Sequence, residues 1–420
     1  MKKYAALIAL MSLPVCVSAE IFETTITVNN IKKNIEETKT FGFDVGQDLF
    51  DQFKEKVLTN GFDNYSNSAY VTAQSNFRGL PFTTVFAENS TELTFRVDRL
   101  GILKTFKGAT RTKSADMLER YLRRNIDGTL SKISKELIAT SATDPLAGNV
   151  TSLQGQMVFS DFQRGCTSCA AGATRTASGV QVNPFLVGVG GGNYTQDGID
   201  ISVINVPIST SFNVDSNDPR KKLLVNGQFN YVAVGNAESY QGGLGIGYLH
   251  PINDHWSLTP GLSYGIIGSP DLVSAGQIFS ASITSNYGVN VNDYSLSMAN
   301  MFGYYKTLPL NVGDVDSDPD ISNYVLKNGF FVGKNLPYDV LGHKLNLMGF
   351  FTDTEFFGSK VFSRQYNEIG FQIGTIEDVA WLKKVSFGMA DKISFSAKYI
   401  FSIEDSNSLE GYDLGISYQF

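Results

Sequence analysis

The chain has 420 residues, with 34 Lys and Arg against 41 Asp and Glu, and a formal net charge of -7. Its apolar content of 42% and aromatic content of 12% are too high for a disordered chain, and its acidic balance argues against a general nucleic-acid binder. A mean hydropathy of -0.07 argues against a bundle of membrane-spanning helices. A β-protein, either soluble or built into a membrane, fits these numbers.

The first nineteen residues have the pattern of a secretory signal peptide. Lys2 and Lys3 precede a short apolar stretch, residues 5–15, and short side chains stand at positions 17 and 19. This arrangement predicts export and cleavage after Ala19. A lipoprotein site at Cys16 is the alternative, although Pro and Val precede that cysteine where small residues are expected.

Residues 20–140 are predicted to form a mixed region of helices and strands. Apolar residues recur at helical spacing within residues 44–58, and the runs 82–87 and 93–97 flank a turn as in a hairpin. A longer helix is predicted from Ser114 to Ala139, with Gly128 weakening its middle. Whether this region is periplasmic, lumenal or a short passenger is left open.

The segment from residue 96 to residue 135 is strongly basic. It has eleven Lys or Arg and four Asp or Glu, whereas residues 182–420 have 13 basic and 23 acidic side chains. A basic helix ahead of an acidic barrel could plug the lumen. The alternative is a helix outside the barrel with one face in solvent.

Residues 141–181 are predicted to be a linker that contains a CxxC motif, Cys166 and Cys169. In an exported chain this pair favours a small structural disulfide. Redox exchange and metal binding are the alternatives, but the sequence has no second CxxC motif to complete a zinc site.

From residue 182 to residue 420 the pattern is strict alternation of apolar and small polar residues, typical of strands. The polar face is mostly Gly, Ser, Thr, Asn and Gln, and residues 223–305 contain no Lys or Arg. These features predict a closed antiparallel membrane β-barrel that faces lipid outside and a lumen inside. Twelve strands are predicted, centred on residues 182–190, 199–212, 223–234, 240–250, 255–266, 277–287, 293–305, 322–333, 341–351, 367–376, 391–402 and 411–420.

The count of strands also predicts two sets of connections. With the C-terminus in the periplasm, the turns at 251–254, 288–292 and 336–339 are periplasmic. The loops at 268–275, 306–321 and 352–366 are then external, and they are mostly longer, as expected for such barrels.

The last strand carries the most specific signal. Its apolar residues alternate with Asp413, Gly415, Ser417 and Gln419, and they are Tyr412, Leu414, Ile416, Tyr418 and Phe420. With the segment 144–154, just ahead of the barrel, this end resembles autotransporter β-domains, and most closely solitary autotransporter-like barrels without a large passenger. The resemblance implies that the terminal aromatic is read by the barrel assembly machinery and that periplasmic chaperones are partners. Residues 20–181 lack the repeat pattern of a β-helical passenger.

Three further patterns are weak candidate sites. Asp314, Asp316, Asp318 and Asp320 alternate in an external loop and could hold a cation, but Pro319 stands where a calcium loop needs Gly, so a solvated loop is the competing interpretation. His250 and His255 flank the turn at 251–254, which contains Asp254 and could suggest a hydrolase, but no nucleophile motif accompanies them, so polar turn residues are the competing interpretation. The glycine cluster at 188–192 lacks the helix and Lys of a phosphate loop and instead marks strand curvature.

The sequence therefore predicts an outer-membrane protein with a non-enzymatic surface or translocator role. A porin-like channel with a basic helical plug is the first alternative, and a membrane-embedded hydrolase is the second. No catalytic residue, cofactor or nucleic-acid partner is expected. Lipid and lipopolysaccharide are the expected partners, and the oligomeric state stays open.

Overall fold

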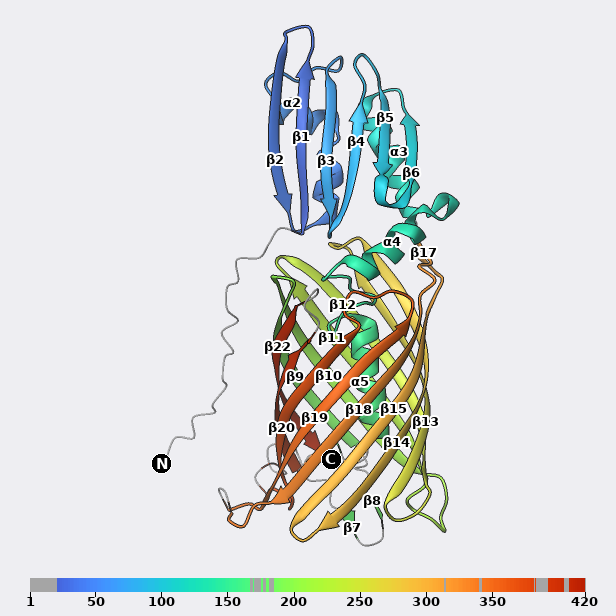
Figure 1. Ribbon diagram of the computed structural model, residues 1–420, viewed down its shortest axis with the longest axis vertical. Coiled ribbons are helices and arrows are strands. Elements are labelled where there is room, and N and C mark those ends of the chain that lie inside the picture. The colour runs from blue at the N-terminus through green and yellow to red at the C-terminus, as the bar shows by residue number, and fades with distance from the viewer. Residues whose placement is uncertain are drawn as a thin grey trace.

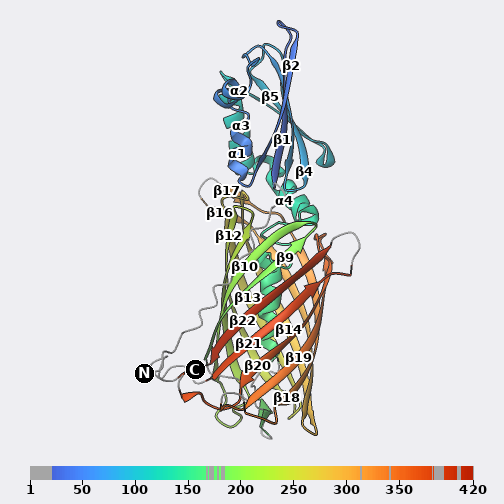
Figure 2. The ribbon, with the colours of Figure 1, turned by 90° about the vertical axis from the view of Figure 1, so that its left-hand side faces the viewer.

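The computed structural model describes residues 21–166, 169, 175–176, 179–180, 185–312, 315–339, 342–380, 382, 392–403 and 408–419 (Figure 1). The signal peptide predicted for residues 1–19 lies outside the described residues. The described chain forms an N-terminal sheet domain that stands over one end of a long barrel (Figures 1 and 2).

The barrel is a closed antiparallel sheet of twelve strands. Closure is made by the first strand, β9, which pairs with the second strand and also with the last strand, β22. The predicted fold class and the number of strands are confirmed. The strands are β9 (Phe185–Gln196), β10 (Ile199–Asn213), β11 (Lys222–Val234), β12 (Ala237–Pro251), β13 (Trp256–Ser269), β14 (Ser274–Val291), β15 (Tyr294–Leu308), β18 (Ser322–Asn335), β19 (Leu345–Gly358), β20 (Gln365–Thr375), β21 (Lys392–Phe401) and β22 (Leu409–Gln419).

Alternation along these strands places apolar side chains outside and small polar side chains inside. On β12, Leu244 and Ile246 are 71% and 51% exposed, whereas Gln241 is buried and hydrogen-bonds inside the barrel. Phe302 on β15 and Phe330 on β18 are likewise about half exposed. The outer wall is therefore an apolar belt, which is the surface a lipid bilayer requires.

The predicted connections sort to the two ends of the barrel. Those at 268–275, 306–321 and 352–366 lie at the end below the N-terminal domain, and those at 251–254, 288–292 and 336–339 lie at the opposite end (Figure 1). Length alone does not separate the ends, because two-residue turns join β9 to β10 and β11 to β12 at the domain end. The short strands β16 (Leu310–Val312) and β17 (Val315–Ser317) form a hairpin in one loop of that end.

The N-terminal domain is built on a six-stranded antiparallel sheet in the order β2-β1-β3-β4-β5-β6. One face is covered by helices, and buried side chains such as Phe22, Ile26 and Phe95 pack there with Leu49 and Leu118. The elements are β1 (Phe22–Asn30), β2 (Ile35–Phe43), α1 (Gly46–Asp51), α2 (Glu55–Gly61), β3 (Tyr70–Phe77), β4 (Leu80–Phe86), β5 (Glu92–Val97), η1 (Asp98–Leu100), β6 (Ile102–Lys107), α3 (Arg111–Arg123), η2 (Ile126–Gly128) and α4 (Thr129–Thr140).

Parts of this domain differ from the sequence prediction. The hairpin is confirmed as β4 and β5, but β1, β2, β3 and β6 were not predicted. The single helix predicted for residues 114–139 is two helices, α3 and α4, and the one predicted for 44–58 is α1 and α2. The longer helix breaks because Asn125, Asp127 and Gly128 all have a positive φ, which no α-helix accommodates.

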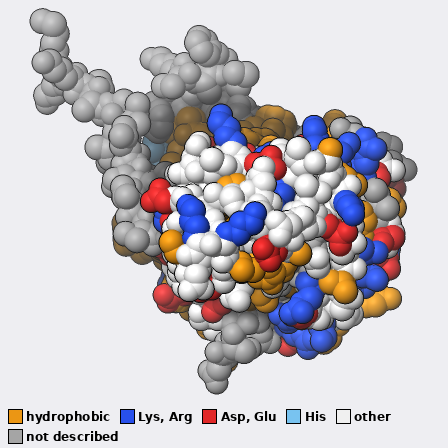
Figure 3. All heavy atoms as spheres, turned by 90° about the horizontal axis from the view of Figure 1, so that it is seen from above, with side chains coloured by type: hydrophobic (Ala, Val, Ile, Leu, Met, Phe, Trp, Pro, Cys, Tyr) orange, Lys and Arg blue, Asp and Glu red, His pale blue; other side chains and the backbone are white. Residues whose placement is uncertain are grey.

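The basic segment 96–135 lies in this domain and not in the barrel, so the prediction of a plug formed by that helix is wrong. Its charges are matched locally, as in the ion pairs of Lys104 with Asp127 and Arg99 with Glu136. Seen from above, Lys and Arg side chains are interspersed with Asp and Glu on the domain (Figure 3). This is the surface of a solvated domain.

The domain is joined to the barrel by a buried segment. Residues 141–158 are all buried and lead from α4 over the mouth of the barrel into its interior. Backbone hydrogen bonds fix the junction, including Gly46 N–H to the Asp271 carbonyl at 2.7 Å and Ser363 N–H to the Gly148 carbonyl at 2.7 Å. The Asn236 side chain also donates to Asp44 at 2.6 Å.

Candidate functional site

A helix lies inside the barrel, and it was not predicted from the sequence. This helix, α5 (Leu153–Gly165), begins where the Ser152 hydroxyl accepts a hydrogen bond from the Gly155 N–H. It packs against β11 to β15 and runs from the domain end toward the end where β9 begins (Figures 1 and 2). The missed signal was the helical spacing of four apolar residues, Leu153, Met157, Val158 and Phe162, all buried.

Asp161 anchors the helix to the barrel wall. Its carboxylate accepts hydrogen bonds from Ser263 at 2.5 Å, Ser280 at 2.8 Å and Tyr305 at 2.9 Å, which lie on β13, β14 and β15. The same carboxylate pairs with Arg164 at 2.9 Å. Because a buried carboxylate is stable only when its lone pairs are satisfied, these four contacts define one seat for α5.

Arg164 makes the complementary anchor one helical turn later. Its guanidinium donates to Asn226 at 2.9 Å, to Ser263 at 2.7 Å and to Ser282 at 3.2 Å. The guanidinium fits because three glycines of the wall leave space between these hydrogen-bonding side chains. A Cβ atom would approach Arg164 within 2.2 to 3.0 Å at each of three glycines, Gly245, Gly247 and Gly261.

A second charged cluster lies in the lumen on strands away from this seat. Glu368 on β20 accepts hydrogen bonds from Lys327, from Lys398 at 2.8 Å and from the Thr352 hydroxyl at 2.7 Å. Lys327 is only 1% exposed and also donates to Thr354 at 2.9 Å. One carboxylate between two ammonium groups ties β18, β20 and β21 together inside the barrel.

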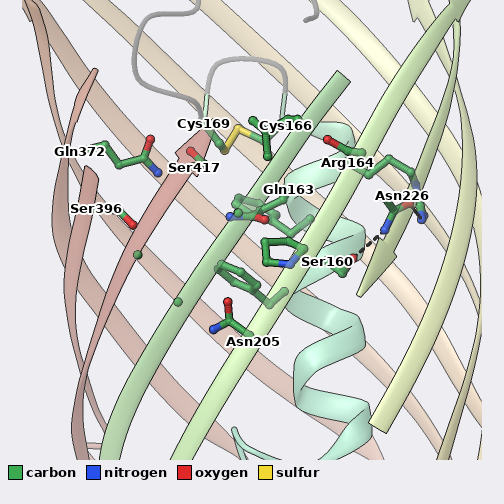
Figure 4. A pocket seen from close by; sticks show the side chains of 18 of the residues that line it. Ser160, Gln163, Arg164, Cys166, Cys169, Asn205, Asn226, Gln372, Ser396 and Ser417 are labelled. Atoms are coloured by element: carbon green, nitrogen blue, oxygen red, sulfur yellow. Dashed lines mark hydrogen bonds between the residues drawn. A yellow bond between two sulfur atoms is a disulfide. The ribbon is translucent and has the colours of Figure 1, made fainter. Parts of the chain in front are cut away.

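The helix leaves part of the lumen unfilled. A cavity of about 270 Å³, named here the lumen cavity, lies between α5 and the wall formed by β9, β10 and β20 to β22. Asn205, Gln372 and Ser396 face α5 across it (Figure 4). It reaches from the Lys327–Glu368–Lys398 cluster toward Leu186 and Thr210, near the strand ends opposite the N-terminal domain.

The glycine cluster of β9 makes room for this cavity. Gly188 and Gly190 line it, together with Gly415 on the paired strand β22. A Cβ atom at Gly190 would lie 2.8 Å from the Asn205 Oδ1 atom, so the Asn205 side chain takes the place that a larger residue would fill. These glycines therefore shape a lumenal hollow, in addition to permitting strand curvature.

The wall that surrounds these groups identifies the environment of the molecule. Its backbone groups are paired around a closed ring, its outer face is mainly apolar, and its charged clusters are inside. Only a closed barrel of strands can satisfy every backbone group in hydrocarbon without helices. The chain is an outer-membrane β-barrel. In the described part of the chain no helix is both long and apolar enough to span a bilayer.

The predicted cysteine pair lies at the C-terminal end of α5. Cys166 and Cys169 are joined by a disulfide, and both side chains are buried in the cluster that contains Met157 and Phe162. The bond links two residues directly after the helix. Of the three functions considered for this motif, the arrangement corresponds to a structural disulfide.

The acidic loop does not assemble into a cluster where it is described. Asp320 pairs with Lys306, and Asp316 lies in the β16–β17 hairpin opposite Asn311. Asp318 makes no described contact with Asp316 or Asp320, and Asp314 lies outside the described residues. Within the described ranges, no three His, Cys, Asp or Glu side chains come together as a metal site would require.

The two histidines remain separate turn residues at the end opposite the domain. The Nδ1 atom of His255 lies 3.2 Å from the Gly288 carbonyl, and the His250 ring lies 6.0 Å from the Tyr248 ring at a tilted angle. Asp254 pairs with Arg220 at 2.8 Å and with neither histidine. This geometry does not bring an acid, a base and a nucleophile together.

The closing strand has the predicted orientation. Tyr412 and Ile416 are 48% and 40% exposed on the outer wall, and Leu414 and Tyr418 share their face of β22. Asp413 points inward and accepts a hydrogen bond from Tyr194 at 3.1 Å. Phe420 lies outside the described residues, so its part in barrel assembly stays a prediction.

No protein-family model and no curated protein sequence matches the chain. Among solved structures, the β-domain of the Bordetella autotransporter BrkA is 12% identical over 57% of this chain and all of that domain, with a TM-score of 0.39. The translocator domain of the autotransporter NalP from Neisseria meningitidis is 12% identical over 64% of this chain and 96% of its own, with a TM-score of 0.38. LpxR from Salmonella typhimurium is 9% identical over 56% of this chain and all of its own, with a TM-score of 0.35. The barrel fold itself rests on the strand pairing described above.

Proposed function

We propose that the barrel anchors and displays its own N-terminal domain, residues 21–140, at the cell surface, in a non-enzymatic translocator role. The observation that carries this is the path of the chain. After the domain, α5 passes down the lumen, and β9 begins at the far end of the barrel. The domain therefore lies on one side of the membrane and both ends of the barrel sheet lie on the other.

The direction from which the chain enters the membrane assigns each end of the barrel to one side of the membrane. An exported chain enters the outer membrane from the periplasm, so we assign the ends near Phe185 and Gln419 to the periplasm. The domain is then external, and its mixed-charge surface suits contact with water. This assignment also makes the loop at 306–321 external.

Labelling of intact cells tests the proposal. Thr38, exposed on the edge strand β2, and Asp339, exposed in a turn at the opposite end, are each changed to Cys in the full chain. Cys166 and Cys169 are bonded, and Cys16 belongs to the predicted signal peptide, so the new thiol is the reactive one. A membrane-impermeant maleimide is expected to label Thr38→Cys in intact cells and Asp339→Cys only after permeabilisation. The reverse pattern would refute surface display.

The channel alternative has less support. An open pore needs a continuous aqueous path, whereas α5 is fixed to five strands and the remaining space is a cavity that ends at the Lys327–Glu368–Lys398 cluster. The hydrolase alternative has no supporting arrangement among the described histidines.

A further inference from the structure

The lumen cavity has polar groups that find no partner among the described residues. The amides of Gln163 on α5 and Asn205 on β10, and the hydroxyl of Ser396 on β21, line the cavity (Figure 4). Within the described part of the chain, none of the three has a hydrogen-bond partner. Each can both donate and accept a hydrogen bond. They come from three elements and meet across one space, so a bound molecule could contact all three.

The charged groups around the cavity are balanced among themselves. Lys327 and Lys398 flank Glu368, and Lys398 also lies near the Asp413 carboxylate. Arg164 is paired with Asp161 at 2.9 Å. Three positive charges thus face three negative charges. Among the described residues, a free anion or cation entering the cavity would meet no unpaired counter-charge, and it would lose its hydration shell without compensation.

Part of the cavity wall is aromatic. Phe159 projects from α5 with the Lys398 ammonium 4.0 Å from its ring centre, and Phe331 and Phe350 line the cavity from β18 and β19. A site that combines flat apolar faces with a few orienting polar groups is typical of small-molecule pockets. At about 270 Å³, the cavity lies just below the usual range for drug-sized ligands, so its ligand is small.

We propose that the lumen cavity binds a small neutral saccharide, a mono- or disaccharide, that enters from the end of the barrel opposite the N-terminal domain. A sugar ring has C–H faces that pack on Phe159. Its hydroxyls donate and accept, as the Gln163 amide, the Asn205 amide and the Ser396 hydroxyl require. It carries no charge, in keeping with the balanced wall. This binding site is independent of which side of the membrane displays the domain.

Isothermal titration calorimetry on the full-length protein tests the proposal. The protein is held in an amine-oxide detergent, because sugar-based detergents would compete for the site. Glucose and lactose are compared with glucuronate and glucosamine, which have similar size and carry a charge. We expect one neutral sugar to bind with a stoichiometry of one, at least tenfold more tightly than either charged sugar.

Substitutions locate the binding. Gln163→Leu and Phe159→Ala are each expected to weaken binding at least tenfold. Gln228→Leu is the matched control, because Gln228 also faces the lumen but does not line the cavity. Retained heat-modifiable migration of each variant on gels verifies that its barrel is folded. No binding of either neutral sugar, equal or tighter binding of a charged sugar, or unchanged binding by folded Gln163→Leu would each overturn the proposal.

Discussion

Asp161 is one of two charged residues that hold α5 in position against the barrel wall. Its carboxylate meets three hydroxyls and Arg164 in the buried lumen. Asp161→Ala leaves the Arg164 charge buried without its partner, and losses of this kind cost about 3–5 kcal/mol. We expect faster amide hydrogen exchange in α5 and more frequent current openings in planar bilayers. Asp116→Ala, the same substitution at a partly exposed position of α3 outside the barrel, is expected to change neither. Equal behaviour of the two variants would contradict the role of Asp161 as an anchor.

Asp127 makes the folding stability of the N-terminal domain depend on pH. The side chains of Lys104 at 2.5 Å, Tyr121 at 2.6 Å and Thr129 at 2.7 Å all donate to this carboxylate and hold its pKa below the usual value. A lowered pKa in the folded state adds stability above the unfolded-state pKa of about 3.9, and this stability is lost as pH falls further.

The consequence is a pH-dependent effect of Asp127→Asn. The variant is expected to exchange amide hydrogens in β6 and α3 faster than the parent at pH 7. The difference should shrink as pH falls below about 4, because Asp127 of the unfolded chain then takes up a proton while the folded parent, with its lowered pKa, still resists protonation. Hydrogen exchange of the full-length protein at pH 7, 5 and 3 measures this. A difference that stays constant over the three pH values would show that Asp127 acts through shape and not charge.

At the level of elements, two strands bring an amide pair to the lipid face. Asn300 on β15 and Asn328 on β18 are register partners, and the Asn300 side chain donates to Asn328 at 2.6 Å. Their neighbours along the same face are exposed apolar residues, Met298, Phe302, Leu326 and Phe330. Each amide thus satisfies part of the other's hydrogen-bonding capacity in a surrounding that offers no water.

A double-mutant cycle tests that pairing. Asn300→Leu or Asn328→Leu alone leaves one amide without its partner in lipid, and we expect a loss of about 1 kcal/mol. Both substitutions together restore a continuous apolar belt and should recover that loss or exceed the parent. Denaturant unfolding of the protein in lipid vesicles measures the four stabilities. Strictly additive losses would mean that the two amides do not depend on each other.

Predictability from the sequence also varied by element. The barrel strands could be predicted because lipid outside and a small-residue lumen inside impose a strict period of two, visible from Trp256 to Ile266. The helix α5 was missed because Gly155 and Gly165 interrupt a short apolar pattern that only the enclosing barrel makes helical. On β1, Thr24 takes an inward position between Phe22 and Ile26, where its hydroxyl pairs with Ser75 at 2.8 Å, so the apolar alternation is broken. The lumen cavity could not be predicted, since its walls come from strands far apart in the sequence.

At the scale of the whole molecule, we expect the domain to be displayed at the surface while α5 lies in the lumen of the same molecule. The chain reaches the domain only through α5, whose anchors lie on strands β11 to β15. The Asn226 side chain on β11 donates to the Ser160 hydroxyl at 2.6 Å, so cysteines at these two positions are expected to form a disulfide under mild oxidation.

Surface proteolysis of the oxidised double-cysteine variant tests whether the domain is outside while α5 lies in the lumen. Intact cells carrying Ser160→Cys with Asn226→Cys are oxidised and then treated with protease. We expect the domain to be removed while the barrel fragment keeps the bond, because α5 stays in the lumen when the domain is outside. The pair Ser160→Cys with Ser396→Cys, across the lumen cavity, should not form the bond. If the cleaved fraction lacks the disulfide between the cysteines introduced at positions 160 and 226, the domain is displayed only when α5 has left its position against the barrel wall.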